Sequence, residues 1–203
     1  HPEVFSPPEL MLLQFNTLSE RLRRYSGARR FWLEGLQRGV MELEGISQGE
    51  AAALLTRFEE EGMHVPGLYD WLQRRLGGRL LVDKSPGYSQ HVDNMRRAEA
   101  MFDGALYIHL QRHPLACIRS FEKARLDEVS NLDSHDFTRR ELAEFNWLAG
   151  HENILAFLSE VPAERQTTLR FEDLVGDPEG EMRRICAFIG LDFHPGMLQP
   201  YEG

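Results

Sequence analysis

Apolar residues recur every three or four positions through most of the first third of the chain, which is the spacing of an amphipathic helix. Four such segments, one opened by two prolines, span residues 7–25, 28–43, 47–62 and 65–78. Ser47 with Glu50 has the spacing of a capping box, and the glycines at 77 and 78 end the fourth segment. The pattern therefore predicts four helices before residue 79.

From residue 79 onward, short apolar runs alternate with helical patterns. The runs predicted as strands span residues 79–86, 105–112 and 166–175, and the helical patterns span residues 87–102, 114–126, 137–161 and 177–191. Strands that alternate with helices imply parallel βαβ units. We therefore expect an α/β fold with a parallel sheet flanked by helices, and ligands bind such sheets beyond the carboxyl ends of the strands.

A cation lies near the end of each predicted strand, at Lys84, Arg112 and Arg170. One such residue is commonly a solvated boundary charge, but three in one sheet favour an anion site. Arg112 also precedes a helix whose positive N-terminal end suits an anion, and a guanidinium matches phosphate geometry. Ser120 lies well inside that helix, so spacing alone makes it a surface hydroxyl.

Composition limits the classes of function. A formal net charge of −9 argues against a non-specific nucleic-acid or anionic-membrane binder, although an acidic protein can hold a local basic pocket. No apolar run is long enough to span a membrane and no signal-peptide pattern opens the chain, so we expect a cytoplasmic protein. The two cysteines, Cys117 and Cys186, fall in apolar helical patterns as core thiols, and no Cys/His cluster has zinc spacing, so no metal is expected.

Three segments carry a family resemblance, in the order that the family has them. "LQRHPLACIRSF" (110–121) resembles the 3′-phosphate-binding segment of the sulfotransferases that use 3′-phosphoadenosine 5′-phosphosulfate (PAPS). The resemblance implies that Arg112 and Ser120 hold the 3′-phosphate of that donor. "LRFEDLVGDPEGEMRRICAFIGL" (169–191) is similar to the "RYEDLV-x-DP" stretch of the family, with Phe171 in the usual tyrosine position. "LVDKSPGY" (81–88) resembles the strand that brings a lysine, here Lys84, to the transferring sulfuryl group.

The whole pattern looks most like the sulfotransferase domains of modular polyketide synthases and olefin synthases. "HPEVFSPPEL" (1–10) resembles the stretch that follows the P-loop-type phosphosulfate loop, which makes Glu9 the catalytic glutamate. That group sulfates the β-hydroxyl of an acyl chain on an acyl carrier protein, and a thioesterase then assists decarboxylation to a terminal alkene. By this resemblance we expect residues 1–203 to be one partial sulfotransferase domain, truncated at both ends and inactive as it stands.

Sulfuryl transfer needs positioning, charge stabilisation and a base. The resemblance implies Glu9 as the base and Lys84 as the cation that stabilises the leaving phosphate or the sulfuryl oxygens. His151, on the long predicted helix, is the alternative base. Two other readings remain open: transfer to a free small-molecule or carbohydrate hydroxyl, and a nucleotide-binding module that has lost catalysis.

Other residues are possible neighbours of this site. Trp147 and Asn153 are possible pocket residues, although core packing is the simpler reading of the tryptophan. Segment 124–142 is either a flap over the acceptor or a plain connection. Arg139 and Arg140 are candidates for contact with a phosphopantetheine phosphate or an acidic carrier protein.

Overall fold

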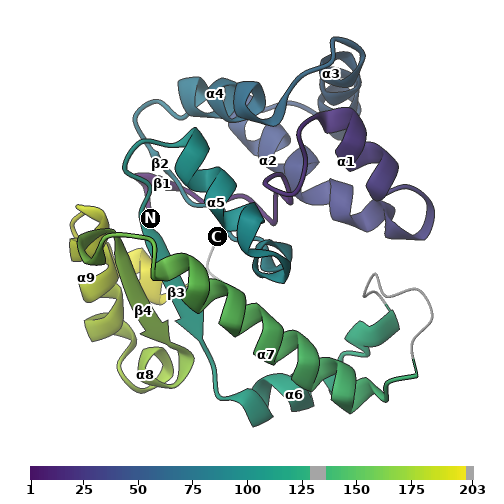
Figure 1. Ribbon diagram of the computed structural model, residues 1–203. Coiled ribbons are helices and arrows are strands. Elements are labelled where there is room, and N and C mark those ends of the chain that lie inside the picture. The colour runs from purple at the N-terminus through teal and green to yellow at the C-terminus, as the bar shows by residue number, and fades with distance from the viewer. Residues whose placement is uncertain (129–135, 200–203) are drawn as a thin grey trace. The chain divides into compact units, whose positions relative to one another are not determined.

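The computed structural model describes residues 1–128 and 136–199 of the chain, which divides into two compact units (Figure 1). The first unit comprises His1–Tyr88 and the second comprises Ser89–Gly203. Each unit holds one pair of parallel strands, in place of the single parallel sheet that the sequence predicts. The parallel pairing and the flanking helices agree with the expected α/β class.

In the first unit, β1 (Val4–Phe5) pairs with β2 (Leu80–Leu81), so that Val4 lies opposite Leu80. The helices between these strands are α1 (Leu18–Arg24), α2 (Glu34–Glu44), α3 (Gln48–Glu60) and α4 (Val65–Arg75), with a 3₁₀ helix at Gly27–Leu33. The capping box predicted at the start of α3 is present. The core of the unit is apolar and fully buried, formed by residues that include Phe5, Leu18, Leu36, Val40, Leu68 and Leu72.

The first predicted helix, residues 7–25, is wrong over its first eleven positions. Two prolines open the segment, and Met11 has a φ of 51°, a left-handed conformation that no α-helix contains. The helix begins only at Leu18, where Thr17 and Glu20 form a second capping box. The apolar residues before it are buried as irregular chain, with Leu10 and Leu12 wholly inaccessible to solvent. The pattern therefore identified core residues correctly and their backbone conformation incorrectly.

In the second unit, β3 (Tyr107–Gln111) pairs along its length with β4 (Gln166–Arg170). Its helices are α5 (Val92–Met101), α6 (Pro114–Lys123), α7 (Arg139–Leu158), α8 (Phe171–Gly176) and α9 (Pro178–Ile189). The strand predicted over 166–175 ends at Arg170, because α8 begins at the next residue with Glu172 and Asp173 in its first turn, where carboxylates are favoured.

A small apolar cluster packs one face of the second sheet against α7. Phe157, Leu158 and Val161 are buried at its centre, and the ring of Phe157 meets that of Tyr107 edge-on at 4.8 Å between centroids. Cys186 is buried and Cys117 partly buried, both as free thiols. Within the described residues, no helix has the combination of length and apolar character needed to cross a membrane.

Candidate active site

The first unit brings two predicted site residues into contact. Glu9 lies in the irregular chain after β1, and Lys84 lies just beyond β2. The Lys84 ammonium donates a hydrogen bond to Oε1 of Glu9 and forms an ion pair with it. That hydrogen bond, helped by the lysine charge, lowers the pKa of the Glu9 carboxyl below its ordinary value. Glu9 is therefore ionised at neutral pH while the pair is intact.

Backbone amides of the chain after Glu9 join it to the chain around Lys84. Two successive N–H groups of the chain after Glu9 donate to side chains that follow Lys84: Met11 to Ser85 Oγ at 3.0 Å and Leu12 to Tyr88 Oη at 3.0 Å. Since Ser85 follows Lys84 directly and Met11 lies two residues after Glu9, these bonds fix the register in which the two charged side chains meet.

Asp83 is the centre of this arrangement. Its carboxylate is partly buried and accepts hydrogen bonds from Tyr69 Oη at 2.6 Å, Tyr88 Oη at 2.7 Å and Ser85 Oγ at 3.0 Å. Burial raises the pKa of Asp83, and the hydrogen bonds oppose that rise. A buried carboxylate with this many donors is a rigid anchor, because moving any one donor leaves a charge in an apolar surrounding.

A buried arginine also holds the irregular chain that contains Leu10. Arg21 of α1 is 4% exposed, and its guanidinium donates to the Leu10 carbonyl at 3.1 Å and to the Trp32 carbonyl at 2.9 Å. Burial lowers the pKa of Arg21 to about 10, so the side chain stays charged at neutral pH. The Leu10 carbonyl and the amides of Met11 and Leu12 are thus satisfied by side chains, which is why the irregular chain beside Glu9 is stable in the core.

Helix α2 approaches Glu9 at a glycine. A Cβ atom on Gly35 would overlap the carbonyl oxygen of Glu9, so only glycine fits there. A cleft of about 180 Å³ opens at this contact, and its lining consists of Pro8, Glu9, Phe31, Trp32, Glu34, Gly35 and Arg38. Glu9 is therefore one of the residues that line a small cavity, together with the aromatic residues Phe31 and Trp32.

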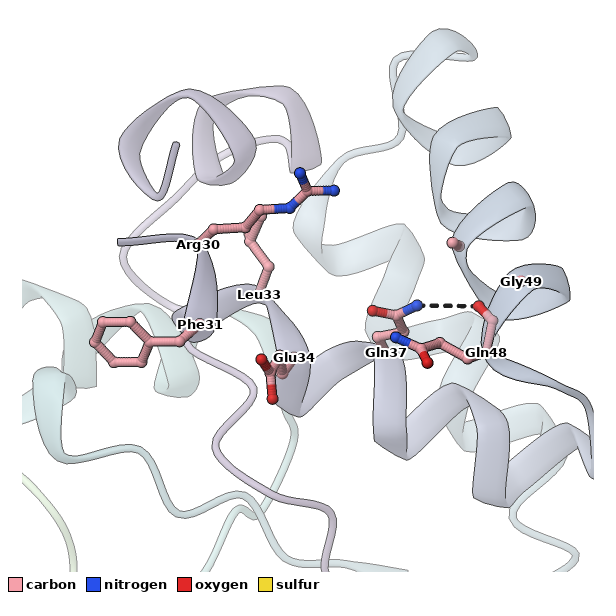
Figure 2. Close-up of a pocket in the computed structure, with 8 residues that line it drawn as sticks. Arg30, Phe31, Leu33, Glu34, Gln37, Gln48 and Gly49 are labelled. Carbon is pink, nitrogen blue, oxygen red and sulfur yellow. Dashed lines mark hydrogen bonds between the residues drawn. The ribbon is translucent and has the colours of Figure 1, made fainter. Parts of the chain in front are cut away.

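A larger cavity, of about 680 Å³, shares two of these residues, Phe31 and Glu34. Figure 2 shows that its lining comes from the 3₁₀ helix, α2 and the start of α3. The amide of Gln37 donates to the carbonyl of Gln48 at 3.0 Å, which ties α2 to the start of α3 across this cavity (Figure 2). The shared residues make the two cavities neighbours on one side of α2.

The second unit brings together another pair of predicted residues, Arg112 and Phe171. Gln111 lies opposite Arg170 in the sheet, so the next residue of each strand leaves the same edge. The guanidinium carbon of Arg112 lies 4.7 Å from the centroid of the Phe171 ring, a cation–π contact. The Nε atom of Arg112 is buried, and no described residue accepts a hydrogen bond from it.

Ser120 lies apart from that pair along α6. It is exposed, and six residues separate it from Pro114 at the start of the helix, a rise of about 9 Å. A hydrogen bond links the chain just after β3 to the chain just after β4, since the His113 amide donates to Oε1 of Glu172 at 3.0 Å. That bond lowers the pKa of Glu172.

The alternative base, His151, belongs to a polar row that the sequence did not reveal. Nε2 of His109 lies 3.0 Å from Nδ1 of His151, and Nε2 of Gln111 lies 3.2 Å from Nδ1 of His109. Burial lowers the pKa of both histidines, that of His109 to about 4 with a contribution from its neighbour. Both rings are thus neutral at pH 7. The alternation along β3 puts residues 107, 109 and 111 on one face, a signal that was available in the sequence.

Several other predicted residues have structural partners. The Asn153 amide donates to the carbonyls of Ser89 and Gln90 at 2.9 and 3.1 Å, so it holds a turn and is not free to line a pocket. Exposed ion pairs occupy the remaining candidate cations: Arg139 with Asp127, Arg140 with Glu144 and Arg170 with Asp173. The flap predicted within 124–142 falls partly on residues 129–135, which lie outside the described residues.

The described residues contain no group of three or more His, Cys, Asp or Glu side chains arranged to hold a metal ion. Glu9 and Lys84 can exchange a proton or hold an anion, and Arg112 can hold a phosphate. Asp83, Tyr88, Gly35 and His109 escaped prediction. Asp83 and Tyr88 lie in the "LVDKSPGY" segment, but no spacing rule indicates which backbone amides their side chains bind.

Almost the whole chain is similar to known proteins of one family. A profile described as "Sulfotransferase family" matches residues 1–195. The solved structure of the sulfotransferase domain from the curacin biosynthetic pathway superposes with a TM-score of 0.93 at 38% identity, and covers 100% of this chain and 70% of that chain. The sulfotransferase domain from the Synechococcus PCC 7002 olefin synthase gives a TM-score of 0.91 at 37% identity, with the same coverage.

Curated relatives are more distant. Two mouse enzymes, heparan sulfate glucosamine 3-O-sulfotransferases 3B1 and 3A1, are each 26% identical over 132 residues, which is 60% of this chain. The chain spans about a third of the length of these relatives, since the match covers 34% of each.

The contact between Gly35 and Glu9 predicts a specific cost of substitution. Gly35→Ala should destabilise the chain by about 1–3 kcal/mol, because the new methyl group forces α2 away from the Glu9 carbonyl. Urea unfolding measures the effect. The control is Gly49→Ala, where a Cβ meets nothing within 4 Å and the better helix propensity of alanine should leave stability equal or slightly higher. If the Gly35→Ala variant is as stable as the wild type, the close contact between Gly35 and Glu9 is refuted.

The lowered pKa of His109 predicts acid sensitivity. The unfolded chain binds a proton at this residue near pH 6.5 and the folded chain only near pH 4, so stability is complete above pH 6.5 and falls as the pH drops toward 4. His109→Asn should flatten the dependence of the unfolding free energy on pH in that window. The exposed His64→Asn variant serves as the control and should keep the wild-type slope. Equal slopes for both variants would refute the assignment.

Proposed function

This chain belongs to the sulfotransferase family, and from that premise we propose that it transfers a sulfuryl group from PAPS to the β-hydroxyl of an acyl chain on an acyl carrier protein. The sulfate ester would then leave as carbon dioxide is lost, with a terminal alkene as the product. Carrier protein and neighbouring synthase domains, including a thioesterase, are the proposed partners, and the cytoplasm is the proposed location.

The observation that carries this choice of acceptor is the likeness to the curacin and olefin synthase domains. It extends over the whole chain at 37–38% identity, whereas the likeness to the heparan sulfate enzymes extends over 132 residues at 26%. The cleft beside Glu9 adds a second argument. Glu34 is a further carboxylate in its lining, and Phe31 and Trp32 are aromatic. Glu34 forms an ion pair with Arg38, which also lines the cleft, so the aromatic residues are what suit an apolar acyl chain.

The proposed donor contacts fit the residues present in the second unit. Arg112 has no carboxylate partner within ion-pair distance among the described residues, and the Phe171 ring covers one face of its guanidinium. The edge of that group is thereby left to grip a phosphate with two parallel hydrogen bonds. We assign Arg112 and Ser120 to the 3′-phosphate of PAPS, with Phe171 orienting the arginine.

The proposed chemistry begins from the Glu9–Lys84 pair. Once Lys84 turns to the oxygens of the donor, Glu9 loses the hydrogen bond that lowers its pKa and becomes a stronger base. Glu9 takes the proton of the acceptor hydroxyl as the new oxygen–sulfur bond forms. The bond between sulfur and the 5′-phosphate oxygen breaks, and Lys84 stabilises the charge that develops on that leaving oxygen.

Two other readings remain candidates. A free small-molecule or carbohydrate hydroxyl is an alternative acceptor for the same chemistry. A nucleotide-binding module without catalysis is the alternative from another functional class. The assays below separate all three, because they measure nucleotide binding and transfer to two kinds of acceptor independently.

Substitution of Arg112 tests the donor contact. Arg112→Ala should weaken the binding of adenosine 3′,5′-bisphosphate to the full-length protein by at least about tenfold, the scale of a charge-assisted hydrogen bond. Calorimetric titration gives the affinity. Arg119→Ala, an exposed arginine on the same helix, is the control and should bind as the wild type does. Unchanged affinity in the Arg112 variant would rule out the phosphate assignment.

Substitution of the charged pair tests the chemistry. In the full-length protein, Lys84→Ala and Glu9→Gln should each lower turnover by about a hundredfold or more. Mass spectrometry of a β-hydroxyacyl carrier protein incubated with PAPS detects the added sulfuryl group, and a free β-hydroxy acid is the comparison substrate. Transfer to the free acid alone would favour the second reading, and nucleotide binding without any transfer would favour the third.

A further inference from the structure

A row of three polar side chains runs from β3 to α7 in the second unit. Gln111 Nε2 lies 3.2 Å from Nδ1 of His109, and His109 Nε2 lies 3.0 Å from Nδ1 of His151. His109, in the middle of the row, is 4% exposed. Because a buried imidazole needs partners for both ring nitrogens, the row defines where the protons of both histidines reside.

The direction of hydrogen-bond donation along the row follows from Gln111. An amide nitrogen only donates, so Gln111 Nε2 donates to Nδ1 of His109. A neutral imidazole that accepts at Nδ1 carries its proton at Nε2. His109 therefore donates from Nε2 to Nδ1 of His151, and His151 in turn carries its own proton at Nε2.

The far nitrogen of His151 is the open end of this row. Nε2 makes no hydrogen bond to a described residue, and His151 as a whole is partly exposed. The Trp147 ring packs against the His151 imidazole, with 4.4 Å between centroids and a 45° angle between planes. The ring is thus held from one side by a hydrogen bond and from another by an aromatic face.

We propose that Gln111 and His109 are positioning residues that hold His151 in its Nε2–H form, so that α7 offers a ligand a hydrogen-bond donor and not a base. The tautomer is independent of the function of the protein. Its catalytic consequence rests on the proposed sulfuryl transfer: the proton of the acceptor hydroxyl goes to Glu9, and His151 donates to an oxygen of the bound substrates.

The charge state of the row supports this assignment. Burial lowers the pKa of His109 to about 4, and it lowers that of His151 as well. Neither ring gains a second proton near neutral pH, so the donor and acceptor sequence stays intact. A base at His151 Nε2 would require the whole row to reverse, with Gln111 presenting its oxygen to His109.

Nitrogen-15 spectra of the imidazole rings in the full-length protein at pH 7 test the tautomers directly, because protonated and unprotonated ring nitrogens resonate far apart. We expect His109 and His151 both to be protonated at Nε2 and unprotonated at Nδ1. Protonation of His151 at Nδ1 in the wild type would overturn the proposal without any variant.

Gln111→Glu tests whether residue 111 sets the direction. A carboxylate only accepts, so it should draw the His109 proton to Nδ1 and reverse both tautomers. Gln73→Glu, the same change at an exposed position of α4, should leave both spectra as in the wild type. A folded Gln111→Glu variant with unreversed rings would refute the positioning role. If that variant does not fold, Gln111→Leu should leave His151 in a mixture of tautomers, and a single unchanged tautomer would refute the role equally.

Turnover of two His151 variants tests the catalytic consequence. His151→Gln keeps an N–H donor and loses basicity, whereas His151→Leu loses both. We expect the Gln variant to turn over at least about tenfold faster than the Leu variant, the scale of one hydrogen bond. Equal loss in both variants would overturn the donor role. If the wild type transfers no sulfuryl group at all, the proposed function fails, whereas the tautomer result still stands or falls by the spectra.

Discussion

Two backbone amides of an apolar segment, Met11 and Leu12, donate to the side chains of Ser85 and Tyr88, which in turn donate to the Asp83 carboxylate. A buried amide without an acceptor costs about 1–3 kcal/mol, so an irregular segment in a core is stable only where such acceptors exist. These bonds let the chain beside Glu9 leave helical geometry and remain buried. The Glu9–Lys84 pair is a consequence, since each charged residue is the sequence neighbour of an anchored one.

The second unit reaches its own pairing by a different route, the register of a parallel sheet. Because Gln111 and Arg170 are opposite each other, the residues that follow them emerge side by side, and Arg112 stacks on Phe171. In the second unit the backbone hydrogen bonds of the sheet fix the pairing, whereas in the first unit side-chain acceptors fix it. In both units the candidate residues lie just beyond the ends of strands, which is where ligands bind in α/β folds.

The sequence predicted most of this and failed at identifiable points. The family-like segments put Lys84, Arg112 and Phe171 near strand ends, and each of them lies one to three residues beyond a strand in the structure. The irregular chain before α1 was predicted as helix, since apolar spacing reports burial and cannot report which groups satisfy the amides. His109 was missed because strand alternation places residues 107, 109 and 111 on one face but does not identify the partner of His109 on α7, 42 residues away. The prediction of a strand over residues 171–175 was wrong because a helix begins there, with two acidic residues in its first turn, despite the apolar pattern.

The ion pair between Glu9 and Lys84 also couples two equilibria. If the Lys84 ammonium binds the Glu9 carboxylate in the free protein and the sulfuryl donor in the complex, then it must leave the carboxylate in order to bind the donor. Thermodynamic reciprocity requires that whatever bound donor does to the proton affinity of Glu9, a proton on Glu9 does in equal measure to the affinity for donor. In that case the basicity of Glu9 and the affinity of the site for the donor share one coupling free energy, which acts through Lys84.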